Sequence, residues 1–198
     1  MEQHMKYAFQ AIIFLGLAFT LQAQANPTSD ASSESKQSIN WASEKDISKH
    51  IEFRLEKEYG EVTYGPNFAP SDTKLSDHFS EIYLTRLIDH KGADHYALYI
   101  TAQYNDTDWR SYKDAVNKQG NKLHLVSLSK NENVCENTSC RYEERLAIPL
   151  SFLYFFDGAT MGLDVTLSGS RTNQINIPIA YFKAMMNSIP QESLYDEL

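Results

Sequence analysis

The sequence predicts a mainly β protein, an antiparallel β-sandwich or open barrel with an N-terminal helix and a short C-terminal helix. Apolar and polar residues alternate with a period of two in several segments, most plainly in Leu163–Ser168. Polar turn segments separate these stretches at intervals of about ten residues. No alternation of strands with helices and no internal repeat is visible, and parallel βαβ units would show such an alternation.

The N-terminus has the features of a cleavable signal peptide. Ala11–Leu21 is an apolar run, and Ala23-Gln24-Ala25 provides the small-x-small site that signal peptidase requires. The sequence therefore predicts a signal peptide over 1–25, with cleavage after Ala25. The short, alanine-rich run is typical of bacteria, which predicts a periplasmic location. The run is too short to cross a bilayer and no second long apolar stretch follows, so we expect no transmembrane segment in the mature chain.

Residues 26–42 form a Ser-rich, polar stretch that we expect to be a disordered lead-in. Residues 43–198 then form a single β-rich domain. The net charge of −8 argues against nucleic acid and anionic membranes as partners.

Residues 43–59 favour a helix, because apolar residues recur every four positions from Ile47 to Tyr59 and Gly60 follows. Ser43 and Asp46 resemble a weak capping box at its start. Ile51, Phe53 and Leu55 also fit a strand, so both alternatives stay open. Residues 62–76 contain one glycine and two prolines and are expected to be irregular.

The period of two begins at residue 82. It predicts a hairpin of strands 82–88 and 96–104, a polar connection over 105–120, a strand at 122–129, and a turn at Asn131 and Asn133. The second arm of a further hairpin spans 142–150. Residues 152–156 (FLYFF) are expected to be a strand buried on both faces, or else a partly exposed partner contact. Pro178 opens a short helix whose apolar side carries Ile179, Phe182, Met186 and Ile189.

Cys135 and Cys140 are expected to form a disulfide, since an exported chain with an even number of cysteines usually pairs them. Four residues separate them, unlike the redox Cys-x-x-Cys motif, so we interpret the bridge as structural. Closing so short a loop contributes about 2 kcal/mol in the chain-entropy estimate.

Glu144 is the most unusual residue, because the alternation places a carboxylate on the apolar face of its strand between Tyr142 and Leu146. Arg86 lies between Leu84 and Ile88 in the same way. We expect Arg86 and Glu144 to form a buried ion pair. The alternative is that Glu144 is a catalytic acid or base of raised pKa.

Four potential metal ligands, Asp89, His90, Asp94 and His95, occur within one turn. Imidazole and carboxylate groups suit zinc or a similar ion. Polar turns are rich in these residue types in any case, so we expect no metal and no cofactor here.

The pattern Trp109-Arg110-x-Tyr112-x-x-Ala115, with Cys135, Cys140-x-Tyr142-x-Glu144 and Ile148, resembles that of an uncharacterised family of small exported gammaproteobacterial proteins. The resemblance covers the middle of the chain and implies an exported β-rich domain, with no catalytic residues to transfer. If Trp109, Arg110 and Tyr112 lie together, they could line a small binding surface. Alternatively, Trp109 and Tyr112 plug one end of the sandwich.

The sequence lacks Gly-x-Ser-x-Gly and His-Glu-x-x-His motifs. We therefore expect a non-catalytic periplasmic protein with a binding or structural role, whose partner is an unidentified protein or small-molecule ligand. The alternative is a periplasmic hydrolase that uses Glu144 or a metal at the His90/His95 turn.

Overall fold

The computed structural model describes residues 38–136 and 139–188, and all of its helices and strands belong to the compact unit that begins at Asn40. The predicted signal peptide over 1–25, most of the predicted lead-in and residues 189–198 lie outside the described residues. Ile189, predicted on the C-terminal helix, is among them.

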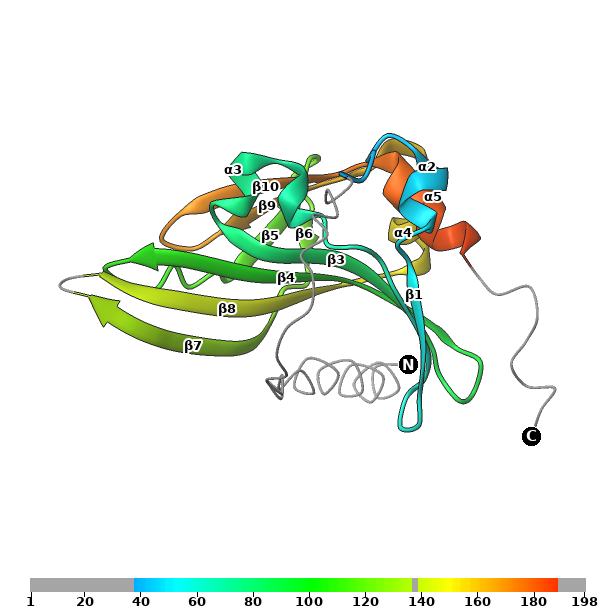
Figure 1. Cartoon of the computed structure of the whole chain (residues 1–198), viewed down its shortest axis with the longest axis horizontal. Coiled ribbons are helices and arrows are strands. Elements are labelled where there is room, and N and C mark those ends of the chain that lie inside the picture. The colour runs from blue at the N-terminus through cyan, green and yellow to red at the C-terminus, as the bar shows by residue number, and fades with distance from the viewer. Residues whose placement is uncertain (1–37, 137–138, 189–198) are drawn as a thin grey trace, which may run out of the picture. The chain divides into compact units, whose positions relative to one another are not determined.

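Two antiparallel sheets form the framework (Figure 1). The first sheet has six strands in the order β1-β2-β3-β4-β8-β7. Their bounds are β1 Glu52–Glu56, β2 Gly60–Tyr64, β3 Phe79–Ile88, β4 Asp94–Asp106, β7 Val126–Glu136 and β8 Ser139–Leu150. The second sheet has four strands in the order β10-β9-β5-β6, with bounds β5 Asp114–Asn117, β6 Lys122–Leu123, β9 Leu163–Ser168 and β10 Thr172–Ile177.

Short helices accompany the sheets. They are α2 Glu44–Ser48, the 3-10 turn η1 Ala69–Ser71, α3 Thr73–Ser76, α4 Phe152–Met161 and α5 Ile179–Asn187. Figure 1 shows α2, α4 and α5 gathered at one end of the sheets. The predicted β-sandwich with a helix toward each end of the chain is confirmed, and the described strands do not close into a barrel.

The core lies between the inner faces of the two sheets and under α4 and α5. Fully buried side chains on β3, β4 and β8 occupy alternate positions, as the period of two requires; they include Ile82, Leu84, Leu98, Ile100, Leu146 and Ile148. Tyr181 of α5 reaches this layer, and its hydroxyl donates a hydrogen bond to the backbone oxygen of Pro66. This contact anchors α5 against the start of the first sheet.

The segment 43–59 contains both of the predicted alternatives, one after the other. Ser43 caps α2 by accepting a hydrogen bond from Asp46 N, but the helix ends at Ser48. The chain then forms β1, which pairs with β2 as a hairpin. The prediction of one helix up to Tyr59 was therefore wrong, because pairing with β2 overrides a weak helical period.

The prediction of a buried strand at 152–156 was also wrong, because this run starts helix α4. Ser151 accepts a hydrogen bond from Tyr154 N at 3.2 Å and caps the helix, and Gly162 ends it at φ 75°. Phe155 is buried against Tyr96, with ring centroids 4.3 Å apart. Gly158 lies so close to Phe182 of α5 that an added Cβ would clash with the ring.

Five smaller expectations need correction. Residues 62–76, predicted to be irregular, contain the end of β2 and two short helical turns. The connection over 105–120 includes β5, and the predicted strand 122–129 divides into β6 and the start of β7. The predicted turn at Asn131 and Asn133 is absent, since β7 continues to Glu136. In the predicted lead-in, Trp41 packs on Phe68 with centroids 4.8 Å apart, so that end is ordered.

No helix in the described ranges combines the length and the apolarity that crossing a membrane would require.

Candidate functional site: a closed carboxylate network

Glu144 lies on the inner face of β8, as the alternation predicted, and its side chain is completely buried. Its carboxylate accepts a hydrogen bond from the Tyr104 hydroxyl and two from backbone N–H groups, from Ser111 at 2.9 Å and from Tyr112 at 3.2 Å. The Lys130 ammonium lies 3.3 Å from Oε2. Four groups thus neutralise and bond a carboxylate that would otherwise be costly to bury.

The two backbone donors form a small nest for this anion. Ser111 adopts φ 50°, the left-handed region that non-glycine residues rarely occupy. In this conformation the successive N–H groups of Ser111 and Tyr112 point to the same side and bind the two oxygens of one carboxylate. The protein fills the nest with its own carboxylate, which stabilises the turn between β4 and β5.

Tyr104 connects the carboxylate to the residue before the nest. Its hydroxyl donates to Glu144 and accepts a hydrogen bond from Arg110 N at 2.8 Å. Burial, followed by the bond to Glu144, raises the pKa of the Tyr104 hydroxyl. The hydroxyl therefore keeps its proton at neutral pH.

Lys130 closes the network on the solvent side. It comes from β7, where the register places it opposite Glu144. Its ammonium also donates to Ser111 Oγ at 3.1 Å and lies 5.4 Å from the centre of the Trp109 ring. Trp109 in turn packs on Tyr142, with centroids 4.6 Å apart. Lys130, Trp109 and Tyr142 together cover Glu144 from the side on which β7 lies.

Arg110 and Tyr112 connect the network to the second sheet. The Arg110 guanidinium is buried 4.0 Å above the Tyr104 ring and donates to the Tyr112 hydroxyl at 3.4 Å. The Tyr112 hydroxyl donates to Asn173 of β10 at 2.6 Å. Trp109, Arg110 and Tyr112 do lie together, with Arg110 and Tyr112 buried and Trp109 partly exposed.

The turn between β9 and β10 packs directly on this segment. Ser170 N donates to Arg110 O at 2.7 Å, and Arg171 pairs with Asp106 at 3.0 Å. A Cβ on Gly169 would collide with the carbonyls of Arg110 and Ser111, so only glycine fits there. A hydrogen bond from Thr107 N, together with the nearby arginines, lowers the pKa of Asp106.

The predicted ion pair between Arg86 and Glu144 is absent. Arg86 donates to both carboxylate oxygens of Asp94, at 2.7 and 2.9 Å. In the register, Arg86 lies opposite Tyr96, whereas Glu144 lies opposite Ala102. Six positions along β4 separate these rows, about 20 Å at the rise of a strand. Both residues face inward, but they lie near opposite ends of the sheet.

The turn with four potential metal ligands brings only Asp89 and His95 together. Asp94 is engaged by Arg86, and His90 Nε2 lies 3.0 Å from Lys57 O. Asp89 accepts from the backbone N–H groups of Lys91 and Ala93, and His95 Nε2 lies 3.3 Å from its other oxygen. Burial alone would raise the pKa of Asp89, but these hydrogen bonds lower it. The arrangement is that of an Asx turn.

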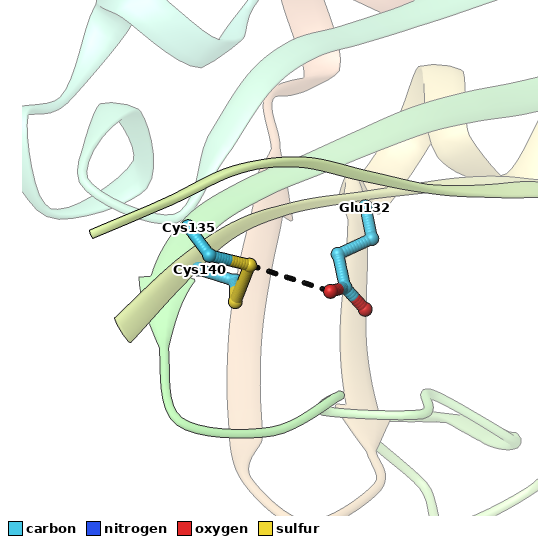
Figure 2. A group of neighbouring side chains, drawn as sticks. All are labelled: Glu132, Cys135 and Cys140. Atoms are coloured by element: carbon cyan, nitrogen blue, oxygen red, sulfur yellow. Dashed lines mark hydrogen bonds between the residues drawn. A yellow bond between two sulfur atoms is a disulfide. The ribbon is translucent and has the colours of Figure 1, made fainter. Parts of the chain in front are cut away.

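The predicted disulfide between Cys135 and Cys140 is confirmed, and the two residues lie opposite each other across β7 and β8. Figure 2 shows Glu132 beside them, with Oε1 3.4 Å from Cys135 Sγ. A sulfur in a disulfide carries no hydrogen and is not a thiolate, so this group neither donates to Glu132 nor provides a metal ligand in the bridged state. The bridge instead fixes the ends of the hairpin that carries Lys130 and Glu144.

Sequence reasoning missed Tyr104, Ser111 and Lys130 as members of this network. Tyr104 could have been found, because the alternation places it on the same face as Tyr142 and Glu144. Lys130 depends on the β7–β8 register, which contains two irregularities before the disulfide. The backbone donors of residues 111 and 112 depend on a turn conformation with no sequence signal.

Comparisons with family models, curated proteins and solved structures find no match to this chain.

Proposed function

We propose that this protein is a non-catalytic domain exported to the periplasm by a cleavable signal peptide, with a binding or structural role there. The observation that carries the proposal is the state of Glu144. This carboxylate is fully buried and all of its contacts are with the protein's own donors. A general acid or base must reach a proton of the substrate, and Glu144 has no surface with which to do so.

A serine hydrolase is the strongest competing interpretation, because exposed Ser111 has a strained backbone and a lysine within hydrogen-bond distance. Two features of the geometry argue against it. Lys130 is paired with a buried carboxylate, whereas a general base must be neutral. The N–H groups of Ser111 and Tyr112, which could otherwise stabilise an oxyanion, already bind Glu144.

The hydrolase expected as the alternative has less support. Burial keeps Glu144, the proposed acid, away from any substrate, and at the His90/His95 turn His90 and Asp94 contact Lys57 O and Arg86 rather than the Asp89–His95 pair. The exported location is supported by the apolar run at 11–21 and by the disulfide, which persists in oxidising compartments.

One experiment tests location and chemistry together. The protein is purified from the envelope fraction, its intact mass is measured, and it is then assayed with ester, amide, phosphoester and glycoside substrates. We expect a mass that starts at Asn26 with both cysteines oxidised, and no turnover. Turnover by the wild type that Glu144→Gln or Ser111→Ala abolishes would overturn the proposal, as would an uncleaved chain found in the cytoplasm.

A further inference from the structure

Helix α4 exposes four large apolar side chains, Phe152, Leu153, Phe156 and Met161. Phe152 and Phe156 lie one turn apart, with ring centroids separated by 6.1 Å, and they are 58% and 47% exposed. Leu153 and Met161 are 70% and 64% exposed and lie on one side of the helix at i and i+8. The other side of α4, with Phe155, packs into the core.

At its C-terminal end, this side of α4 opens into a cavity of about 610 Å³. Met161 and Ile179 belong to its wall, together with Trp41, Ile177 and Pro178. The volume falls within the range of about 300–1,000 Å³ that is usual for binding pockets. An exposed apolar helix thus leads into a pocket that could accept an anchoring side chain.

The area of this surface fits a protein partner. If a large apolar side chain has about 150–250 Å² of surface, the exposed fractions of the four α4 residues amount to roughly 350–600 Å². A standard interface buries about 800 Å² on each partner, of which slightly more than half is apolar. The exposed side of α4 therefore matches the apolar part of one such interface.

The charges around the surface are mainly negative. Asp157 lies between Leu153 and Met161 on the helix and has no ion-pair partner within the described part of the chain. Glu44 and Asp164 line the cavity with one cation, Lys183, and Asp164 also pairs with Lys118 at 3.8 Å. The whole chain carries a net charge of −8. These charges disfavour both an anionic lipid surface and a second copy of this acidic chain.

We propose that the exposed side of α4 and the adjoining cavity, defined by Phe152, Leu153, Phe156, Asp157, Met161 and Ile179, bind a protein segment that combines apolar side chains with lysine or arginine. An apolar side chain of the partner fills the cavity, and a basic side chain pairs with Asp157. This inference rests on the proposed binding role and names the chemistry of the partner.

The test uses the purified exported protein and a synthetic amphipathic peptide of leucine and lysine, with a leucine–glutamate peptide of the same pattern as the control. We expect the lysine peptide to bind and the glutamate peptide to bind at least tenfold more weakly. No binding of the lysine peptide, or equal binding of both, would overturn the proposal.

Matched variants locate the binding. The double variant Leu153→Gln, Met161→Gln should bind the lysine peptide at least tenfold more weakly than the wild type. Leu55→Gln should bind it as the wild type does, although Leu55 is equally exposed at 67%. Asp157→Asn should weaken it several-fold and Asp114→Asn, at another exposed aspartate, should leave it unchanged. Equal losses in the two aspartate variants would indicate diffuse charge attraction and would contradict the assigned site.

Two further measurements exclude other occupants. Sedimentation of the wild type as a dimer that Leu153→Gln dissociates would assign the surface to a second copy. Binding to phosphatidylglycerol vesicles that depends on Leu153 would assign it to lipid. Either result overturns this proposal and leaves the absence of catalysis untouched, whereas substrate turnover would overturn the proposed function itself.

Discussion

The network around Glu144 and the exposed side of α4 both contain side chains in an environment that is unfavourable for them, but in opposite senses. A carboxylate enters the interior, where four donors from the protein surround it and its side chain is completely buried. Large apolar side chains stay at the surface of α4 although the same helix buries Phe155. The most unusual polar residue therefore supports the fold, whereas the large side chains that α4 exposes are apolar.

The substitution expected to have the largest effect on stability is Glu144→Leu. It removes the acceptor and leaves two backbone donors, the Tyr104 hydroxyl and Lys130 without their partner. We expect a loss of about 3–5 kcal/mol in the free energy of unfolding, measured by urea denaturation.

Glu143→Leu is the matched control for this substitution. Glu143 pairs with partly exposed Arg145 on the other face of β8, so its loss should cost less than about 1 kcal/mol. Equal losses from the two leucine variants would contradict a special role for the Glu144 network.

Removal of the disulfide should have a smaller effect. The double substitution of Cys135 and Cys140 by serine opens a short loop and should lower the free energy of unfolding by about 2 kcal/mol. Urea denaturation of the wild type in reducing buffer should reproduce the same loss. A much larger loss would mean that the bridge also positions Lys130 over Glu144.

Tyr104→Phe tests the network through its pH dependence. Loss of the hydroxyl should cost about 1–2 kcal/mol at neutral pH. Burial raises the folded-state pKa of Tyr104 above the unfolded value of about 10, so its proton stabilises the fold below that pH. The stabilisation should decline as the pH rises above about 10, where the unfolded chain ionises.

The measurement is the difference in unfolding free energy between wild type and Tyr104→Phe at pH 7 and at pH 10.5. We expect this difference to shrink at the higher pH. Tyr154→Phe on α4 serves as the control, and a difference that grows with pH for Tyr104 would contradict the assigned cause.

The smallest effect is expected at the exposed side of α4. Leu153→Gln should change the free energy of unfolding by no more than about 0.5 kcal/mol, because the side chain is 70% exposed. Phe155→Ala, two positions away and buried, should cost about 3–5 kcal/mol. Thermal unfolding of both variants checks the contrast, and a large loss at Leu153 would show that this side of α4 supports the fold.

Local pattern was a good guide where one face of a strand is buried. The period of two correctly placed Leu84, Leu98 and Ile148 inside, and it identified Glu144 as the exception on that face. It failed at 152–156, because an apolar run has no period and fits a buried strand or a helix equally well. The Ser151 cap and the ring of Tyr96 decide for the helix, and the second of these comes from another strand.

The amino-acid pattern was enough to predict the β-rich class, the disulfide and the inward position of Glu144, because each depends on spacing within short segments. The partners that Glu144 and Arg86 meet, and the side of α4 that stays exposed, became clear only in the folded protein. Partner choice depends on register between strands that are distant in the chain, and a shift of one residue exchanges the two faces of a strand. Exposure depends on which other elements pack on a helix, and the spacing of residues within the helix carries no information about them.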